Sequence, residues 1–333
     1  MYNIAKANPE ERRILFRNAA GRIGINEAMA EKDFWVCLTL DYLFHKCKLK
    51  ESFTFKGGTS LSKCYGLIHR FSEDIDLILD WRLLGYTKDE PWENRSNTKQ
   101  DAFNKEANRR AEVFLKEELL PLLRGDFSEI LDAEPEFYID EPDDPQTICF
   151  NYPCCFSDGS ILRSIRLEIG ALAAWTPSVT KVMSPYAAMI YPDVFSKKET
   201  EILTVSAKRT FWEKVTILHH EANRREGLAM PARYSRHYYD LYCIANSPVK
   251  DEALCDLSLL SKVVGFKMKF YPQRWAKYEE AVPGTLRLVP PEYRFDELRR
   301  DYAGMREMMF GEYPEFDSMM DCIKQLEEEI NRK

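Results

Sequence analysis

The sequence predicts an α/β protein, in which a region of mixed strands and helices is followed by a helical C-terminal region. Phe53 to Leu79 shows a strand, a glycine turn, a helix and a second strand in succession, and a strand hairpin is expected between Gln146 and Ile169. From residue 206 onward, apolar residues recur at helical spacing. The chain has 333 residues, 45% of them hydrophobic, so we expect a large core and two lobes, 1–205 and 206–333.

Two helices are expected before the first strand. Asn8 and Pro9 are suited to the start of a helix that runs to about Ala20. Asn26 can cap a longer second helix that runs to about His45. A buried stripe on this second helix is predicted by the spacing of Phe34, Trp35, Leu38 and Tyr42.

The strand that ends at Leu79 places carboxylates on one of its faces. Ile75, Leu77 and Leu79 alternate with Asp74, Asp76 and Ile78, and side chains two apart on a strand share a face. In the predicted hairpin, Glu168 lies on the face of its strand opposite to Leu167. A third carboxylate is therefore expected on a strand.

Helices are expected again after residue 206. Segment 177–195 is punctuated by proline and is expected to be irregular. A helix that Ser206 can cap is predicted to about Arg225, with Lys214 beside its apolar stripe. A further helix is predicted over 233–246, where Asp240 lies one turn after Arg236.

Overall composition restricts the possible partners. The net charge of −7 argues against a generally basic nucleic-acid coat, so a polyanion would need a local patch. The stretch 208–240 is such a patch, with seven Lys and Arg against four Asp and Glu. The cysteines number nine without CxxC pairs, and there is no signal segment or long apolar run. We therefore expect a cytoplasmic protein with reduced thiols and no membrane segment.

The acidic strand and the glycine turn together indicate phosphate chemistry. Two carboxylates held close together repel each other unless a cation lies between them, and Mg²⁺ is typical of such sites. Asp74 and Asp76 are the predicted ligands, and Glu168 would complete the set or take a proton from an attacking hydroxyl.

The turn Gly57-Gly58-Thr59-Ser60 opens a helix, where free N–H groups and two hydroxyls could bind a phosphate. Positive charge for a triphosphate is expected from Lys214, with Lys56 and Arg70 as weaker candidates that flank the turn. From the residues alone, Lys214 could equally extend its amine to solvent and Asp240 could simply pair with Arg236.

Several motifs resemble those of a known family. Lys56-Gly-Gly-Thr-Ser-Leu-Ser, followed by Arg70-Phe-Ser-Glu-Asp-Ile-Asp-Leu, resembles the abortive-infection AbiE toxin family of nucleotidyltransferases, within the polymerase-beta-like superfamily. Glu31-Lys-Asp-Phe-Trp, Trp212-Glu-Lys and Tyr238-Tyr-Asp-Leu-Tyr are similar to further motifs of the family. The resemblance covers most of the chain and is weakest over the first twenty or so residues and over 81–144.

The resemblance implies a polymerase-beta-like core with a mixed sheet and a helical C-terminal lobe that closes the cleft. It implies that Asp74 and Asp76 hold Mg²⁺, that Lys214 contacts phosphates and that Asp240 is a second essential acid. Glu168 matches the third carboxylate position, where many members have Asp. Nucleotide phosphate would be bound by Gly57, Gly58, Thr59 and Ser60.

The implied activity is transfer of a nucleotide from an NTP to an acceptor, with the 3′ end of tRNA as the expected acceptor. Such a protein would act as a growth-arresting toxin opposed by a separate antitoxin. Two alternatives stay open: a nucleotidyltransferase that modifies a protein or small-molecule hydroxyl, and a catalytically silent module that binds a partner protein.

Overall fold

The computed structural model describes residues 1–159, 161–172 and 177–333 and divides the chain into two compact units. The first unit comprises Met1–Cys64 and Ser72–Val205, and the second comprises Tyr65–Phe71 and Ser206–Lys333. Residues 65–71 belong with the C-terminal residues, although the expected boundary between the lobes was at residue 206.

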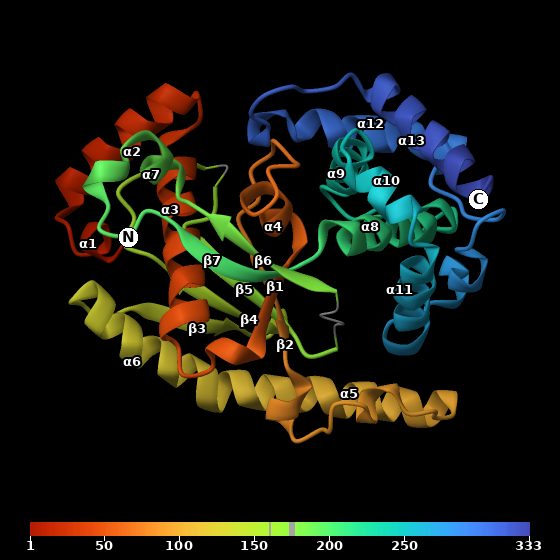
Figure 1. The fold of residues 1–333 in the computed structure, drawn as a ribbon, viewed down its shortest axis with the longest axis horizontal. Helices are drawn as coiled ribbons and strands as arrows, with labels where there is room; N and C mark the ends of the chain where they lie inside the picture. Colours follow the sequence, from red (N-terminus) through yellow and green to blue (C-terminus); the bar gives the residue numbers. More distant parts are fainter. Residues whose placement is uncertain (160, 173–176) are drawn as a thin grey trace. The chain divides into compact units, whose positions relative to one another are not determined.

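The first unit is built on a seven-stranded sheet with the order β3-β4-β5-β2-β1-β7-β6 (Figure 1). Its strands are β1 Phe53–Lys56, β2 Ile75–Leu79, β3 Glu136–Asp140, β4 Asp144–Asn151, β5 Ser164–Gly170, β6 Ser178–Met183 and β7 Thr200–Val205. The β2–β5 and β1–β7 pairs are parallel and the other four pairs are antiparallel. The predicted α/β fold with a mixed sheet is therefore confirmed.

The helices of the first unit are α1 Tyr2–Ala5, α2 Pro9–Ile23, α3 Glu27–Asp41, α4 Gly57–Lys63, α5 Asn97–Phe114, α6 Leu120–Leu131 and α7 Tyr186–Ile190. The predicted caps of α2 and α3 are confirmed. The Asn8 side chain accepts from Glu11 N at 2.9 Å, and the Asn26 side chain accepts from Ala28 N at 2.7 Å. α2 ends where Gly24 adopts φ +80°, a left-handed conformation that suits glycine.

An aromatic cluster shows which helices cover the sheet. Phe137 of β3 and Phe150 of β4 pair in register, and their rings stack at 4.3 Å. Phe127 of α6 lies edge-on to both rings, and Trp35 of α3 lies edge-on to Phe150 at 6.2 Å. α3 and α6 therefore cover the same face of the sheet. Because α3 lies deep in this layer, its residues 28–41 are all buried, which is more than a single apolar stripe.

One expectation about the first unit is wrong. Residues 178–183, expected to be irregular, form the edge strand β6, which pairs along its whole length with β7. The short helix α7 follows after Pro185. Proline punctuates this segment only outside the paired residues, so it does not interrupt the backbone hydrogen bonds of β6.

The second unit is helical, as predicted. It contains α8 Ala207–Ala222, α9 Ser235–Ala245, α10 Val249–Leu254, α11 Leu257–Phe270, α12 Phe295–Gly304 and α13 Phe316–Asn331. Ser206 stands at the N-cap of α8, but its side chain makes no capping hydrogen bond. Residues 69–71 are tied to the C-terminal part of the unit, because Phe71 N donates to Met308 O at 2.7 Å and Phe310 N donates to His69 O at 2.8 Å.

Two general findings concern the whole described chain. In the described ranges, no helix combines the length and apolar content that a bilayer crossing requires. The nine cysteines, all within these ranges, are free thiols.

Candidate active site

Three predicted site residues stand side by side across the sheet of the first unit. In β1, β2 and β5, Lys56 pairs with Asp76 and Asp76 pairs with Glu168. Paired residues of neighbouring strands project from the same face, so these side chains form one row. Lys56 Nζ lies 3.6 Å from Asp76 Oδ1. The face is opposite to the one that carries Leu77 and the aromatic core.

The glycine turn lies directly against Asp76. Gly57 has φ +83°, and a Cβ added there would lie 1.9 Å from Asp76 Oδ2. Only glycine permits both this backbone conformation and this close approach. The turn and the acidic strand, which were expected to act together, are thus in direct contact.

The hydroxyls of the turn are occupied within the first unit. Thr59 Oγ1 donates to the carbonyl oxygen of Asp74 at 2.6 Å and lies 2.9 Å from Ser72 Oγ. Ser60 Oγ donates to Gly57 O at 3.0 Å, and both hydroxyl side chains are buried. These contacts fix α4 against the start of β2. Phosphate binding by Thr59 and Ser60 stays a prediction.

Glu168 lies in an acidic environment. Its side chain is 42% exposed, and Arg166 Nε lies 3.7 Å from its Oε1. Partial burial, together with the negative charges of Asp76 and Asp74, raises the pKa of Glu168 to about 7. A cation near these carboxylates would relieve this repulsion.

The chemistry of this donor set fits Mg²⁺, with Asp74 and Asp76 as the residues that would hold it. In the described part of the chain, no three His, Cys, Asp or Glu side chains come close enough to hold a metal by themselves. Mg²⁺ commonly takes one or two carboxylates and completes its shell with water and substrate phosphates, so a two-carboxylate site suffices. The structure does not bring Glu168 into a group of three ligands with Asp74 and Asp76, so its metal role stays a prediction.

The Glu31-Lys32-Asp33 segment of α3 makes buried contacts to residues next to this site. Its sequence did not indicate this role. Lys32 Nζ donates to Glu73 Oε2 at 2.6 Å, and both side chains are buried. This ion pair anchors the residue immediately before Asp74. An isolated buried charge is costly, so the chain must supply both partners.

The other two acids of the segment anchor neighbouring pieces of the unit. Asp33 pairs with Lys63 at the end of α4 at 2.6 Å and accepts from Tyr186 N at 2.6 Å. Glu31 accepts from the backbone N–H groups of Cys155 and Phe156. A run of three charges in an otherwise apolar helix was the available signal for these buried partners.

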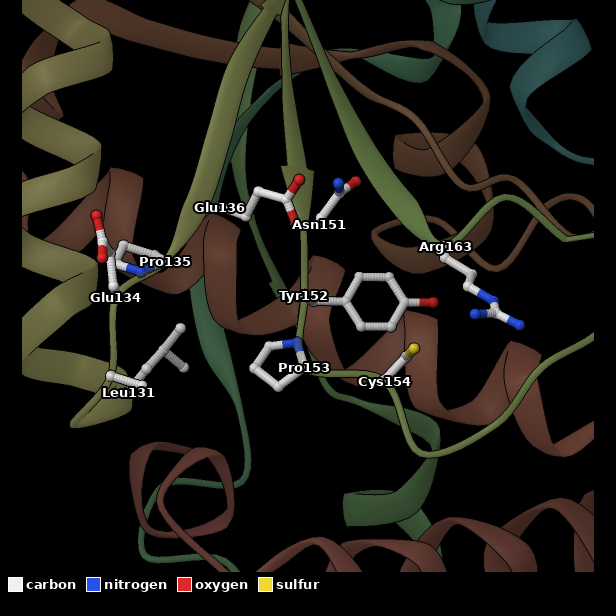
Figure 2. A pocket seen from close by; sticks show the side chains of 10 residues that line it. Leu131, Glu134, Pro135, Glu136, Asn151, Tyr152, Pro153, Cys154 and Arg163 are labelled. Carbon is white, nitrogen blue, oxygen red and sulfur yellow. The ribbon is translucent and has the colours of Figure 1, made fainter.

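A hollow in the first unit lies away from the carboxylates. The pocket has a volume of about 510 Å³ and lies where β3 begins and β4 ends (Figure 2). It is lined by Leu131, Ala133, Glu134, Pro135, Glu136, Asn151, Tyr152, Pro153, Cys154 and Arg163. Arg163 precedes the first residue of β5 whereas Glu168 lies near its end, and the pocket contains no predicted site residue.

The second unit contains the other predicted residues as a buried charge cluster. Asp240 of α9 is fully buried, and its two carboxylate oxygens accept from Arg70 Nε at 2.7 Å and Arg70 Nη2 at 2.9 Å. Lys214 Nζ of α8 donates to Asp240 Oδ2 at 2.6 Å. The two cations outweigh the penalty of burial and hold the pKa of Asp240 well below its usual range. Asp240 therefore stays ionised and acts as an anchor for both cations.

These contacts change the interpretation of Arg70 and Asp240. Arg70, expected to flank the glycine turn, lies buried in the second unit with its guanidinium on Asp240. The partners of Asp240 are Arg70 and Lys214, whereas the sequence offered Arg236 as a neighbour one turn away. Arg70 and Asp240 are 170 residues apart, so sequence spacing gave no sign of this pair.

His237 is a further residue of this cluster that sequence reasoning missed. Its Nδ1 lies 3.0 Å from Lys214 Nζ. Burial and the positive charges of Lys214 and Arg236 hold the pKa of His237 well below its usual range. The ring is therefore neutral, and its Nδ1 accepts a hydrogen bond from Lys214. Burial also lowers the pKa of Lys214 itself.

The mixed sheet and the glycine turn against Asp76 belong to a chain of the nucleotidyltransferase class, as its family match shows. The fold is similar to that of MenT4, a nucleotidyltransferase toxin from Mycobacterium tuberculosis H37Rv, with a TM-score of 0.53 and 16% sequence identity, over 95% of this chain and 88% of that one. Residues 41–322 match the family described as nucleotidyl transferase AbiEii toxin, type IV toxin–antitoxin system. The chain belongs to this AbiEii family of nucleotidyltransferase toxins, and the expected family resemblance is confirmed.

One further solved structure shows a weaker similarity, and no curated protein matches. JHP933 from Helicobacter pylori gives a TM-score of 0.43 at 13% identity, over 92% of this chain and 94% of that one. A search of curated proteins gives no match.

Proposed function

We propose that the protein transfers a nucleoside monophosphate from a Mg²⁺-bound NTP to an RNA hydroxyl, with the 3′ end of tRNA as acceptor. The reaction would take place in the cytoplasm, because NTP and tRNA are found there. As a toxin of the type IV class it would arrest growth and be opposed by a separate antitoxin, as in phage defence by abortive infection. The observation that carries the proposal is the placement of Asp76, which lies against Gly57 and in register with Glu168.

Several of the predicted site residues in the first unit have proposed roles in this reaction. The N–H groups at Gly57 and Gly58 bind phosphate oxygens, and Lys56 adds positive charge beside Asp76. Asp74 and Asp76 would hold Mg²⁺, which supplies charge stabilisation for phosphoryl transfer when bound. Glu168 accepts the proton of the attacking hydroxyl, because it is the carboxylate adjacent to Asp76 on the same face.

Lys214 is the proposed contact to the phosphates. Its NH₃⁺ has three donors, of which two contact Asp240 and His237, so one remains to donate to a phosphate oxygen. Asp240 and Arg70 position this amine.

The bond changes are those of an in-line displacement. The acceptor oxygen forms a bond to the α-phosphorus, and the bond from the α-phosphorus to the oxygen that bridges to the β-phosphorus breaks. Pyrophosphate leaves with the electron pair of that bond, and the hydroxyl proton passes to Glu168.

Labelled nucleotide transfer tests the proposal. The full-length protein, Mg²⁺ and each labelled NTP are incubated with bulk tRNA or with cell protein. We expect label in tRNA, and Asp76→Asn should lower the rate by about 100-fold or more, because a charge that stabilises the transition state is lost. The matched control is Asp143→Asn, which neutralises an exposed aspartate of the same unit.

Three results would contradict parts of the proposal. Label in cell protein but not in tRNA would reject the RNA acceptor. Full activity of Asp76→Asn would reject its catalytic role. Absence of Mg²⁺-NTP binding by calorimetry would favour a silent partner-binding module.

A further inference from the structure

A stretch of the second unit that is rich in positive charge lies outside the motifs considered so far. Residues 257–278 contain five Lys and Arg and no Asp or Glu, in a chain whose net charge is −7. This stretch comprises α11 and the segment after it (Figure 1). Its cationic residues, which we call the α11 basic surface, are Lys262, Lys267, Lys269, Arg274 and Lys277.

Within the described residues, more than half of the cations in the patch that the sequence first suggested, 208–240, are paired with carboxylates. Four of its seven cations form ion pairs, namely Lys208 with Asp256, Arg209 with Glu213, Lys214 with Asp240 and Arg224 with Glu221. A polyanion would have to compete with these carboxylates. The excess of seven over four therefore overstates the charge available there.

Two cations of the α11 basic surface have no such carboxylate partner in the part of the chain that the structure describes. Lys277 pairs with Glu280 at 3.0 Å, but within the described ranges no ion pair is found for Lys262 or Arg274, and both are exposed. Lys262 and Lys269 are seven residues apart, so they lie on the same side of the helix. Leu260 and Val264 lie on the side of α11 opposite to Lys262 and are buried, so Lys262 and Lys269 are directed outward.

Stabilisation of the helix end does not account for this charge. Cations near a helix C-terminus offset its partial negative charge, and Lys267 and Lys269 are in the last turn of α11. Lys262 lies about two turns before the end of the helix, and Arg274 lies beyond it. The effect of the helix end is weak at both positions. The helix end therefore does not explain why Lys262 and Arg274 belong to a stretch that has five cations and no acids.

An exposed aromatic side chain lies beside Lys267. Tyr271 follows the last residue of α11, and 46% of it is exposed. Lys267 Nζ lies 5.6 Å from the centre of its ring. Positive charge beside an exposed aromatic ring is typical of surfaces that bind the phosphates of single-stranded nucleic acid and stack one of its bases. Trp275 is less suited, because the ring of His220 lies 4.2 Å from it.

From this charge complementarity we infer that the α11 basic surface binds the phosphate backbone of the RNA acceptor and that Tyr271 stacks on one of its bases. The inference rests on the proposed function, since it assigns a surface to the acceptor. A partner with a polyphosphate backbone is favoured over a protein, because the surface offers several cations within a short stretch.

Binding of fluorescein-labelled bulk tRNA to the full-length protein, measured by anisotropy over a series of salt concentrations, tests the inference. The variant Lys262→Gln/Lys269→Gln/Arg274→Gln removes three charges from the surface. We expect tRNA affinity to fall at least about tenfold and the slope of log K against log salt to become shallower by about 2. The control Lys48→Gln/Lys50→Gln/Lys198→Gln removes three exposed charges from the first unit and should behave like the wild type.

Tyr271 gives a second test that leaves the charge unchanged. Tyr271→Ala should weaken tRNA binding about tenfold, whereas Tyr271→Phe should keep it, because stacking needs the ring and not the hydroxyl. Circular dichroism melting curves check that each variant is folded.

The outcomes separate this inference from the proposed function. If the surface variant binds tRNA with the affinity and salt slope of its control, or if the wild type does not bind tRNA, the inference is wrong. If the wild type transfers nucleotide to tRNA while the surface variant binds like the control, the proposed function stands and only the surface is rejected. If the wild type binds tRNA through this surface but transfers nothing to it, the proposed function fails alone.

Discussion

Arg70 and Asp240 form a buried two-point ion pair, with Arg70 Nε and Nη2 at 2.7 and 2.9 Å from the carboxylate oxygens. The same carboxylate holds Lys214 at 2.6 Å. Asp240 is thus the common anchor of two cations, and its pKa is held well below the usual range. Asp240 therefore holds both cations in place although it has no access to solvent itself.

Removal of the Asp240 charge should destabilise the second unit. Asp240→Asn leaves Arg70 and Lys214 buried without their counter-charge, so we expect a loss of about 3–5 kcal/mol in the free energy of unfolding. Urea unfolding measures this loss. The double variant Asp240→Asn/Arg70→Met removes one stranded cation and should recover part of the stability. A single variant as stable as the wild type would show that Asp240 is not the anchor.

His237 should position Lys214 through Nδ1. In His237→Asn the amide oxygen can take the place of Nδ1, whereas the longer Gln places its oxygen nearer to Nε2. We expect His237→Asn to keep activity and His237→Gln to raise KM for NTP about fivefold, the effect of one hydrogen bond worth about 1 kcal/mol. Steady-state kinetics on tRNA, with kcat and KM measured separately, checks this. Equal kinetics for the two variants would contradict the role of Nδ1.

Gly57 should tolerate no side chain. In Gly57→Ala the Cβ would collide with Asp76 Oδ2, so the carboxylate must move, and we expect nucleotide transfer to fall about 100-fold. Gly66→Ala is a matched control, because Gly66 also has a positive φ, +61°, but an added Cβ would meet nothing within 4 Å. Comparable losses in the two variants would attribute the effect to backbone strain alone.

The buried pair of Lys32 and Glu73 should support the acidic strand. Lys32→Met leaves Glu73 buried without its cation, and we expect a loss of about 3–5 kcal/mol in the free energy of unfolding. Replacing both residues, as Lys32→Met/Glu73→Leu, removes the unpaired charge and should restore most of the loss in urea unfolding. A double variant no better than the single one would contradict this account.

His220 should make the second unit sensitive to acid. Burial and the positive charges of Arg224 and Lys267 lower the pKa of His220 to about 4, whereas an unfolded histidine titrates near 6.5. Between these values the unfolded chain binds a proton that the folded chain does not. The free energy of unfolding therefore falls as the pH falls from about 6.5 towards 4, by at most about 1.4 kcal/mol per pH unit from this group.

His220→Phe keeps an aromatic ring beside Trp275 and removes the titrating group. Unfolding free energies of both proteins across this pH range give the difference in slope. Parallel curves would show that His220 does not titrate differently in the two states.

The sequence by itself determined the local elements of this protein. Asn8 and Asn26 begin helices through hydrogen bonds to residues two or three positions away. Strand alternation places Ile75 and Leu77 in the core and Asp76 on the opposite face. Such features depend on neighbours along the chain, so spacing is sufficient to predict them. The family motifs around Gly57, Asp74 and Lys214 were visible for the same reason.

Only the tertiary structure decided which residues meet across long separations. The register that sets Glu168 beside Asp76, the contact of Gly57 with Asp76, and the pairs Lys32–Glu73 and Arg70–Asp240 each require distant segments to be placed side by side. Burial then makes each charge depend on a counter-charge, because a buried ion without one is too costly to keep. Sequence spacing carries no information about that partner when it lies 41 or 170 residues away.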